Sequence, residues 1–171
     1  MFDLNPARID GDVFAIVAHP DDVPMHARLR RLFARWRAAA PRQGLPDRAA
    51  LIAEDFGDLA AELWMLEVQR TPLRLRYASC GANVVATIGR DPTGYWLDEL
   101  FPDAQGTRYY ERYRVMADQG VATWRKGRPA FWRGVVPMIE SLMVPLAADG
   151  RTVDHFAAIT VVHDDPDGAA G

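Results

Sequence analysis

Residues Leu63–Ala78 read LWMLEVQRTPLRLRYA, and this stretch decides the fold. From Leu73 onward apolar and basic residues alternate, which is the period of a strand with one solvated face. The preceding Leu63–Val68 is an apolar run of strand length, and Gln69–Pro72 separates the two runs as a turn. The stretch therefore predicts an antiparallel β-hairpin.

The residues after the hairpin form a block of helices and then a set of strands. Gly81–Gly89 is a short helical stretch bounded by glycines, and Gly106–Gly120 is a longer helix that Gly120 is placed to cap. Three strand-like runs separated by hairpin turns fill the last third of the chain. These runs are Val121–Arg125, Phe131–Leu146 with an internal break, and His155–Val162.

The residues before the hairpin contain an amphipathic helix. Apolar residues recur there at i, i+3, i+4, i+7 and i+11, which marks one helical face, and arginines occupy the others. The stripe consists of Leu29, Leu32, Phe33, Trp36 and Ala40. Pro24 is tolerated in the first turn of this helix, and Pro41 and Gly44 end it. Further upstream, Val13–Ala18 is a short apolar run that fits either a strand or a packed N-terminal arm.

Locally paired strands separated by a helical block predict an α+β domain with an antiparallel sheet. We divide the chain into four parts on this basis. They are an N-terminal arm (1–22), a flanking amphipathic helix (23–44), a core domain (45–163) and a disordered tail (164–171).

Composition limits the function classes. The chain has 171 residues, 49% hydrophobic and 25% charged, which suits one globular domain. A net charge of −3 argues against nucleic-acid binding as the main role. No apolar run of about 18 residues occurs, so we expect no membrane span. A lone cysteine, Cys80, and an N-terminus unlike a signal peptide lead us to expect a cytoplasmic protein.

Four segments resemble the PAS domain superfamily, in particular a single-domain bacterial family found in alphaproteobacteria. Leu63–Val68 and Arg74–Ala78 are similar to its first two strands. Gly89–Gly94 with Leu97–Leu100 is similar to its Gly-Arg-Asp-x-Thr-Gly segment, and Ile139–Gly150 to its fourth strand and following turn. Ser141 stands where that family commonly has arginine.

The resemblance implies a five-stranded antiparallel sheet with short helices on one face and a small pocket between them. It also implies a sensory or adaptor domain that acts through protein–protein interaction, often as a dimer, with a small-molecule ligand in some members. Many members of this family have no assigned ligand. We predict no enzymatic activity, no catalytic or metal-binding residue and no cofactor, and we expect a homodimer that signals through an unidentified protein partner.

Two sets of residues are candidates for these roles. One set could line a ligand pocket. It consists of aromatic side chains, one methionine and the polar anchor Glu140, and Arg112 is a second polar anchor. The pocket set is Tyr77, Trp96, Tyr109, Tyr113, Trp132, Glu140 and Met143. The apolar stripe of the flanking helix is the candidate dimer or partner seam, with Leu29, Leu32, Phe33 and Trp36 as its contacts.

Two alternatives remain open. Ala18-His19-Pro20-Asp21-Asp22 is similar to the zinc-binding signature of N-acetylglucosaminyl deacetylases, in which the histidine and second aspartate bind zinc and the first aspartate is the base. Val23 stands where those enzymes have glutamate. The second alternative is a structural dimerisation module with a filled core and no ligand.

Overall fold

The computed structural model describes residues 13–102, 108–128 and 138–163. Six strands form one antiparallel sheet in the order β1-β4-β5-β6-β2-β3. The strands are β1 (Val13–Val17), β2 (Leu63–Arg70), β3 (Leu73–Cys80), β4 (Ala122–Gly127), β5 (Met138–Leu146) and β6 (His155–His163). The helices are α1 (Ala27–Ala39), α2 (Arg48–Ala53), the 3₁₀ helix η1 (Gly57–Leu59), α3 (Ala82–Ile88), α4 (Leu97–Leu100) and α5 (Arg108–Gln119).

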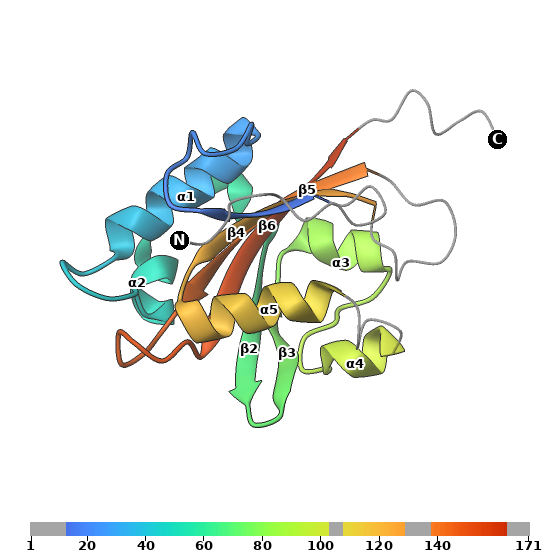
Figure 1. The fold of residues 1–171 in the computed structure, drawn as a ribbon. Coiled ribbons are helices and arrows are strands. Elements are labelled where there is room, and N and C mark those ends of the chain that lie inside the picture. Colours follow the sequence, from blue (N-terminus) through green and yellow to red (C-terminus); the bar gives the residue numbers. More distant parts are fainter. Residues whose placement is uncertain (1–12, 103–107, 129–137, 164–171) are drawn as a thin grey trace.

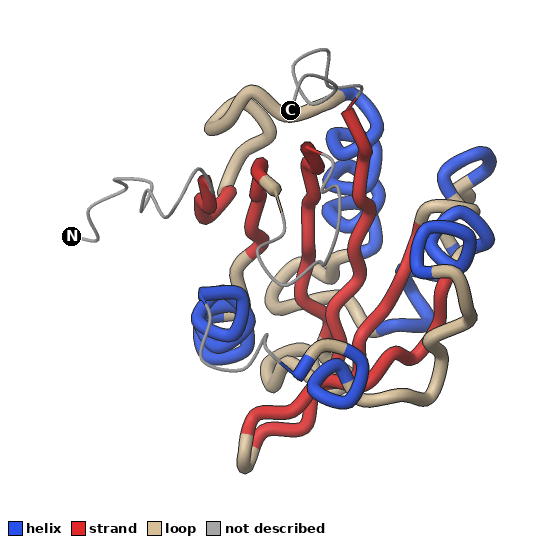
Figure 2. Tube along the Cα trace, turned by 90° about the vertical axis from the view of Figure 1, so that its right-hand side faces the viewer, coloured by secondary structure: helices blue, strands red, loops and turns tan. Residues whose placement is uncertain are grey.

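Helices cover both faces of this sheet. Figure 1 shows α1 and α2 on one side, and α3, α4 and α5 on the other. In Figure 2 the strands lie side by side between these helices. The α+β class and the antiparallel sheet are therefore confirmed. We expected short helices on one face and, in addition, an N-terminal amphipathic helix. The structure places that helix, with α2, on the second face.

The sixth strand comes from the N-terminal arm. β1 pairs with β4 from Val13 opposite Lys126 to Val17 opposite Ala122, which extends the expected five strands at one edge. The sequence left this run open because five apolar residues do not distinguish a strand from a packed arm. The run forms a strand because the edge of β4 is available for it to pair with. The tail predicted at 164–171 and residues 131–137 of the predicted long strand lie outside the described residues.

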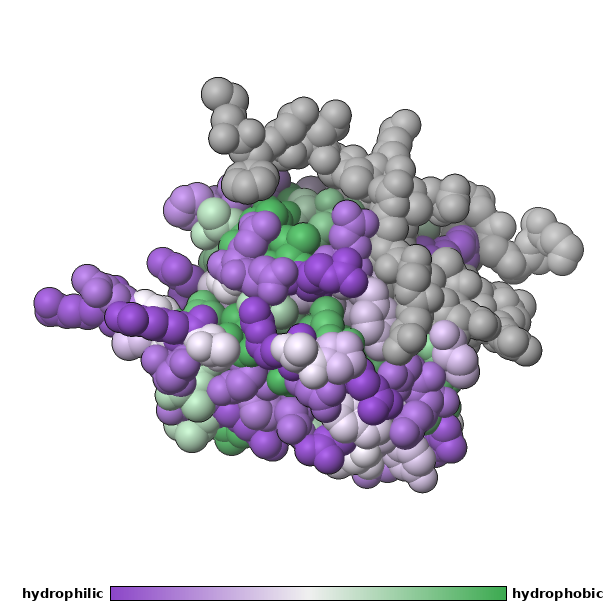
Figure 3. All heavy atoms as spheres, turned by 60° about the horizontal axis from the view of Figure 1, so that its bottom comes forward, coloured by the Kyte–Doolittle hydropathy of each residue, from purple (hydrophilic) through white to green (hydrophobic). Residues whose placement is uncertain are grey.

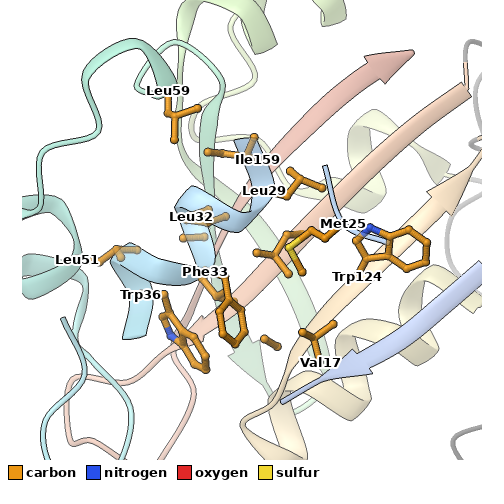
Figure 4. Close-up of a cluster of buried hydrophobic side chains, with 14 of the residues drawn as sticks. Val17, Met25, Leu29, Leu32, Phe33, Trp36, Leu51, Leu59, Trp124 and Ile159 are labelled. Atoms are coloured by element: carbon orange, nitrogen blue, oxygen red, sulfur yellow. The ribbon is translucent and has the colours of Figure 1, made fainter. Parts of the chain in front are cut away.

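The face under α1 is a filled hydrophobic core. Leu29, Leu32, Phe33 and Trp36 are each between 0 and 7% exposed, and they pack toward the sheet (Figure 4). The Trp36 Nε1–H also donates to the carbonyl oxygen of Pro145 on β5, at 2.9 Å. The sequence-based dimer seam is thus corrected, because these four side chains of the stripe pack on the chain's own sheet.

The N-terminus of α1 is set by a contact from far along the chain. The helix begins at Ala27 rather than Pro24, with the His26 Nδ1 accepting from the backbone N–H of Arg28 at 3.2 Å. The backbone N–H of His26 donates to Glu140 Oε1 at 2.7 Å. The start of α1 is therefore held by a hydrogen bond to β5, and it lies three residues beyond Pro24.

Buried apolar side chains form two clusters, one under α1 and one between the sheet and α5. The side of the molecule at the bottom of Figure 1 is mostly hydrophilic, and apolar side chains show there in small areas between polar ones (Figure 3). Among the described residues, no helix is long and apolar enough to cross a membrane.

Candidate functional site

A cavity of about 390 Å³ lies on the second face of the sheet, between the strands and α3, α4 and α5. This volume is at the lower end of the range of about 300–1,000 Å³ that is usual for small-molecule sites. Much of the wall is apolar. The apolar side chains include Val84 and Ile88 of α3, Leu97 of α4, and Ile139, Met143 and Val162 of the sheet.

Three polar residues form a row across the floor of the cavity. Arg125 of β4 is the cross-strand partner of Ser141 on β5, and Ser141 is the partner of Thr160 on β6. All three line the cavity. Cross-strand partners point to the same side of a sheet, so these side chains lie beside one another. We call Arg125, Ser141 and Thr160 the polar row.

Arg112 reaches the same floor from α5. Its Nε donates to Thr123 Oγ1 at 2.7 Å, its Nη2 to the Thr123 carbonyl oxygen at 2.9 Å, and its Nη1 to Ser141 Oγ at 3.2 Å. Arg112 and Arg125 are each 3% exposed. A buried guanidinium is costly unless its donors are engaged, and these bonds fix Arg112 between α5 and the strands. Arg112 thereby positions Ser141 in the polar row.

Tyr77 and Tyr113 also line the cavity. Burial raises the pKa of both phenols, most strongly that of Tyr77, where the neighbouring Tyr113 adds to the effect. Tyr113 also stacks on Phe156, with ring centroids 6.1 Å apart. Both phenols therefore keep their protons at neutral pH and face the cavity as neutral groups that can donate.

The predicted pocket residues separate into three groups. Tyr77, Tyr113 and Met143 line the cavity, and so does the predicted anchor Arg112. Trp132 lies outside the described residues, as does the side chain of Tyr109. Trp96 and Glu140 lie elsewhere, so the structure does not bring these two into the cavity.

Trp96 lies against the outer side of β3. The Arg74 and Arg76 guanidinium carbons are 4.2 and 5.4 Å from the centroid of its ring. Alternation along β3 turns Leu75 and Tyr77 inward and these two arginines outward. Trp96 therefore forms part of a cation–π cluster on the surface.

Glu140 is buried on the opposite face, under α1. Its Oε1 accepts from Trp124 Nε1 at 2.8 Å and from the His26 backbone, and its Oε2 lies 2.8 Å from His163 Nε2. Burial alone would raise the pKa of Glu140, but these donors outweigh it and the pKa is lowered. The carboxylate ties α1 to β4, β5 and β6. Its role as a ligand anchor is therefore corrected to a structural one.

Sequence reasoning missed the polar row, and it predicted the helix α3 without its place in the cavity wall. Arg125, Ser141 and Thr160 are far apart in the sequence and share no motif. The alternation of Glu140 and Ser141 indicates that the two side chains point to opposite faces, but it does not indicate which face holds the cavity. Only the packing of α1 over Glu140 decides that Ser141 faces the cavity.

The residues of the zinc-hydrolase alternative are engaged in local contacts. Asp22 Oδ2 accepts from the backbone N–H groups of Ala18 and His19, each at 2.8 Å, and these bonds lower its pKa. Asp21 pairs with Arg30 at 2.7 Å. Within the described ranges, no three His, Cys, Asp or Glu side chains are grouped to hold a metal ion. This geometry gives the zinc alternative no support.

Cys80 at the end of β3 is half-buried. Burial raises the pKa of its thiol to about 12. The thiol therefore stays protonated at neutral pH and is a poor nucleophile.

Comparison with known proteins identifies one family. Residues 25–160 match the PAS domain, which covers most of the chain. No curated protein matches the sequence. Among solved structures, an RNA-binding light-oxygen-voltage receptor is similar, with a TM-score of 0.49 and 15% identity. That match covers 88% of this chain and 38% of the receptor's length.

Proposed function

Since this chain belongs to the PAS domain family, we propose that it is a sensory domain whose cavity takes a small organic molecule. The bound molecule changes how α3 packs on the sheet, and a separate signalling protein reads that change. The observation that carries the proposal is the cavity of about 390 Å³ between α3 and the sheet.

α3 is anchored at its start and loosely packed along its length. The backbone N–H of Asn83 donates to the Ala61 carbonyl oxygen at 2.8 Å, and that of Gly81 to the Leu63 carbonyl oxygen at 2.8 Å. A side chain at Gly81 would clash, since a Cβ there would lie 2.4 Å from the Ala61 carbonyl oxygen. None of the residues of α3 is buried. Elements with few buried contacts open at low free-energy cost, so α3 is the element a ligand can order.

α1 is a poor candidate for the moving element. Trp36 is hydrogen-bonded to the Pro145 carbonyl oxygen on β5, and Arg28 pairs with Glu62 at 2.8 Å. Moving α1 would expose several fully buried side chains. A ligand in the cavity contacts Val84 and Ile88 on α3 instead. The protein partner, a homodimer and a cytoplasmic location stay part of the proposal.

Amide hydrogen exchange, read by mass spectrometry, tests the proposal. In freshly purified protein freed of small molecules by dialysis, amides of α3 should exchange much faster than those of α1. Native mass spectrometry of undialysed protein should show extra mass that denaturation removes, and this material should slow α3 and leave α1 unchanged. If α3 is as protected as α1 in protein of bare mass, the structural module without a ligand is the better account.

A matched pair of variants sharpens the test. Val84→Trp extends a side chain from α3 into the cavity and should protect α3 as a ligand does. Ala86→Trp places the same ring on an exposed position of the same helix and should leave exchange unchanged. Equal protection by the two variants would contradict the role of the cavity.

A further inference from the structure

Two buried phenols on the cavity wall lack a hydrogen-bond partner. Tyr77 and Tyr113 are 6% and 5% exposed, and both line the cavity. Within the part of the chain that the structure describes, neither phenol oxygen is hydrogen-bonded to another group of the protein. The great majority of buried polar side-chain atoms in proteins have a partner, so two exceptions in one cavity require an explanation.

Several other polar side chains of the wall differ from the phenols in this respect. Trp64 Nε1 donates to Thr160 Oγ1, and Arg112 Nη1 donates to Ser141 Oγ, each at 3.2 Å. The Glu62 carboxylate accepts from an arginine of α1 at 2.8 Å. These groups bond within the protein, whereas the two phenols keep their hydrogens for a partner that the protein does not supply.

The rings that carry these phenols are held in place by other aromatic rings. The ring centroid of Tyr77 is 6.0 Å from that of Trp64, and the ring centroid of Tyr113 is 6.1 Å from that of Phe156. Phenylalanine at either tyrosine position would make the same ring contacts. Packing therefore explains the two rings but leaves their hydroxyls unexplained.

The rest of the wall suits an uncharged ligand with an aromatic body. The Arg112 guanidinium donates through each of its three nitrogens to Thr123 and Ser141, and Arg125 has an interaction of its own. Recognition therefore falls to neutral groups. Flat rings pack well on aromatic side chains. The aromatic residues of the described wall are Trp64, Tyr77, Phe101 and Tyr113.

We infer that the ligand is an uncharged, flat aromatic molecule with a carbonyl oxygen, and that Tyr77 and Tyr113 donate to this oxygen. A carbonyl oxygen has two lone pairs and no hydrogen of its own, so it matches two phenol donors. The aromatic body packs on the rings of the wall, and Val84 and Leu97 add apolar contacts. This inference rests on the proposed function, because it specifies the ligand of the same cavity.

Isothermal titration of the dialysed protein with three matched probes tests the inference. The first is 1-indanone, a flat aromatic ketone. Indane is the same ring system without the oxygen, and octahydroinden-1-one is the same ketone with a saturated body. 1-Indanone should bind at least about tenfold more tightly than indane, as expected for hydrogen bonds to two unpaired donors, and more tightly than the saturated ketone. Equal or tighter binding of either comparison probe, or no binding of 1-indanone, would overturn the inference.

Removal of each hydroxyl locates the carbonyl oxygen. Tyr77→Phe and Tyr113→Phe keep the ring, and each should weaken 1-indanone by about three- to tenfold and leave indane within about twofold. Tyr95→Phe is the matched control, because Tyr95 is 46% exposed and is not among the described lining residues. It should change neither affinity. If both cavity variants bind 1-indanone as tightly as the wild type, the phenols do not hold the ligand.

Thermal unfolding without ligand separates a binding hydroxyl from a structural one. Since the two phenols have no partner in the described protein, Tyr77→Phe and Tyr113→Phe should unfold within about 2 °C of the wild type. A drop of more than about 5 °C for both variants would show that the hydroxyls already stabilise the ligand-free protein. That result would overturn the inference.

The failures of the two proposals are distinguishable. If 1-indanone does not bind but the purified protein carries another molecule that protects α3, the ligand class is wrong and the sensory cavity stands. If 1-indanone binds with the predicted selectivity but α3 exchange does not change, the ligand class stands and the sensory mechanism fails.

Discussion

On β5, Leu142 and Val144 point toward α1 and are fully buried, whereas Ile139 and Ser141 point the other way and line the cavity. One strand thus contributes to a filled core with every second residue and to a hollow site with the residues between. The helices differ in the same manner, because α1 buries four large side chains and α3 buries none. The two faces therefore differ in packing: the α1 face is filled, and the other face combines a buried cluster around α5 with the cavity beside α3.

The polar residues of the two faces differ as well. On the α1 face, Glu140 has donors from Trp124, His26 and His163, so its hydrogen-bonding capacity is used within the protein. On the cavity face, the hydroxyls of Ser141 and Thr160 accept from Arg112 and Trp64 respectively, and both residues line the cavity. A buried polar group whose partners are all internal is structural, and one that faces a cavity suits recognition.

The largest expected difference between the faces is in stability. Leu32→Ala removes a side chain of α1 that is 0% exposed, and it should lower the free energy of unfolding by about 2–5 kcal/mol. Val84→Ala on α3 removes a half-buried side chain and should cost less than about 1 kcal/mol. Urea unfolding followed by tryptophan fluorescence measures both. Similar losses of unfolding free energy for the two variants would contradict the proposed difference in packing between α1 and α3.

The next effect concerns Glu140 and depends on pH. Glu140→Gln weakens bonds to a buried carboxylate and should cost about 1–3 kcal/mol at pH 7. Because the folded pKa of Glu140 lies below the ordinary 4.5, its contribution is complete above pH 4.5 and is lost as the pH falls through the folded value. The stability gap between wild type and variant should therefore narrow on acidification.

Unfolding curves from pH 7 down to pH 3 measure this gap. Glu111→Gln is the control, since Glu111 is an exposed carboxylate on α5. Its stability should follow the wild type throughout. A gap for Glu140→Gln that stays constant with pH would show that the carboxylate of Glu140 contributes nothing by its charge.

The smallest expected effect is on the cavity face. Thr160→Val removes the hydroxyl that accepts from Trp64 Nε1 at 3.2 Å and should cost about 0.5–1.5 kcal/mol. Thermal unfolding measures this loss. A stability loss as large as that of Leu32→Ala would mean that the polar row is structural.

Local patterns predicted most elements of the fold. The alternation after Leu73 predicted β3, the glycines at 81 and 89 bound α3, and the stripe from Leu29 to Trp36 predicted α1. Each of these signals lies within one element, where hydrophobic period and turn chemistry act directly. The sequence did not distinguish a strand from a packed arm at β1, because a five-residue run has no such signal. The strand that β1 pairs with, β4, is more than 100 residues away.

The sequence by itself determined the α+β class, the antiparallel sheet and the resemblance to PAS domains, because these depend on local periodicity and short motifs. It also supplied Tyr77, Tyr113 and Met143 as residues of the cavity. Only the tertiary structure decided that α1 packs on its own sheet, that Glu140 faces α1, and that Arg125, Ser141 and Thr160 meet in one row. Those outcomes depend on which face of each strand is covered and on cross-strand register, and both are set by contacts between distant segments.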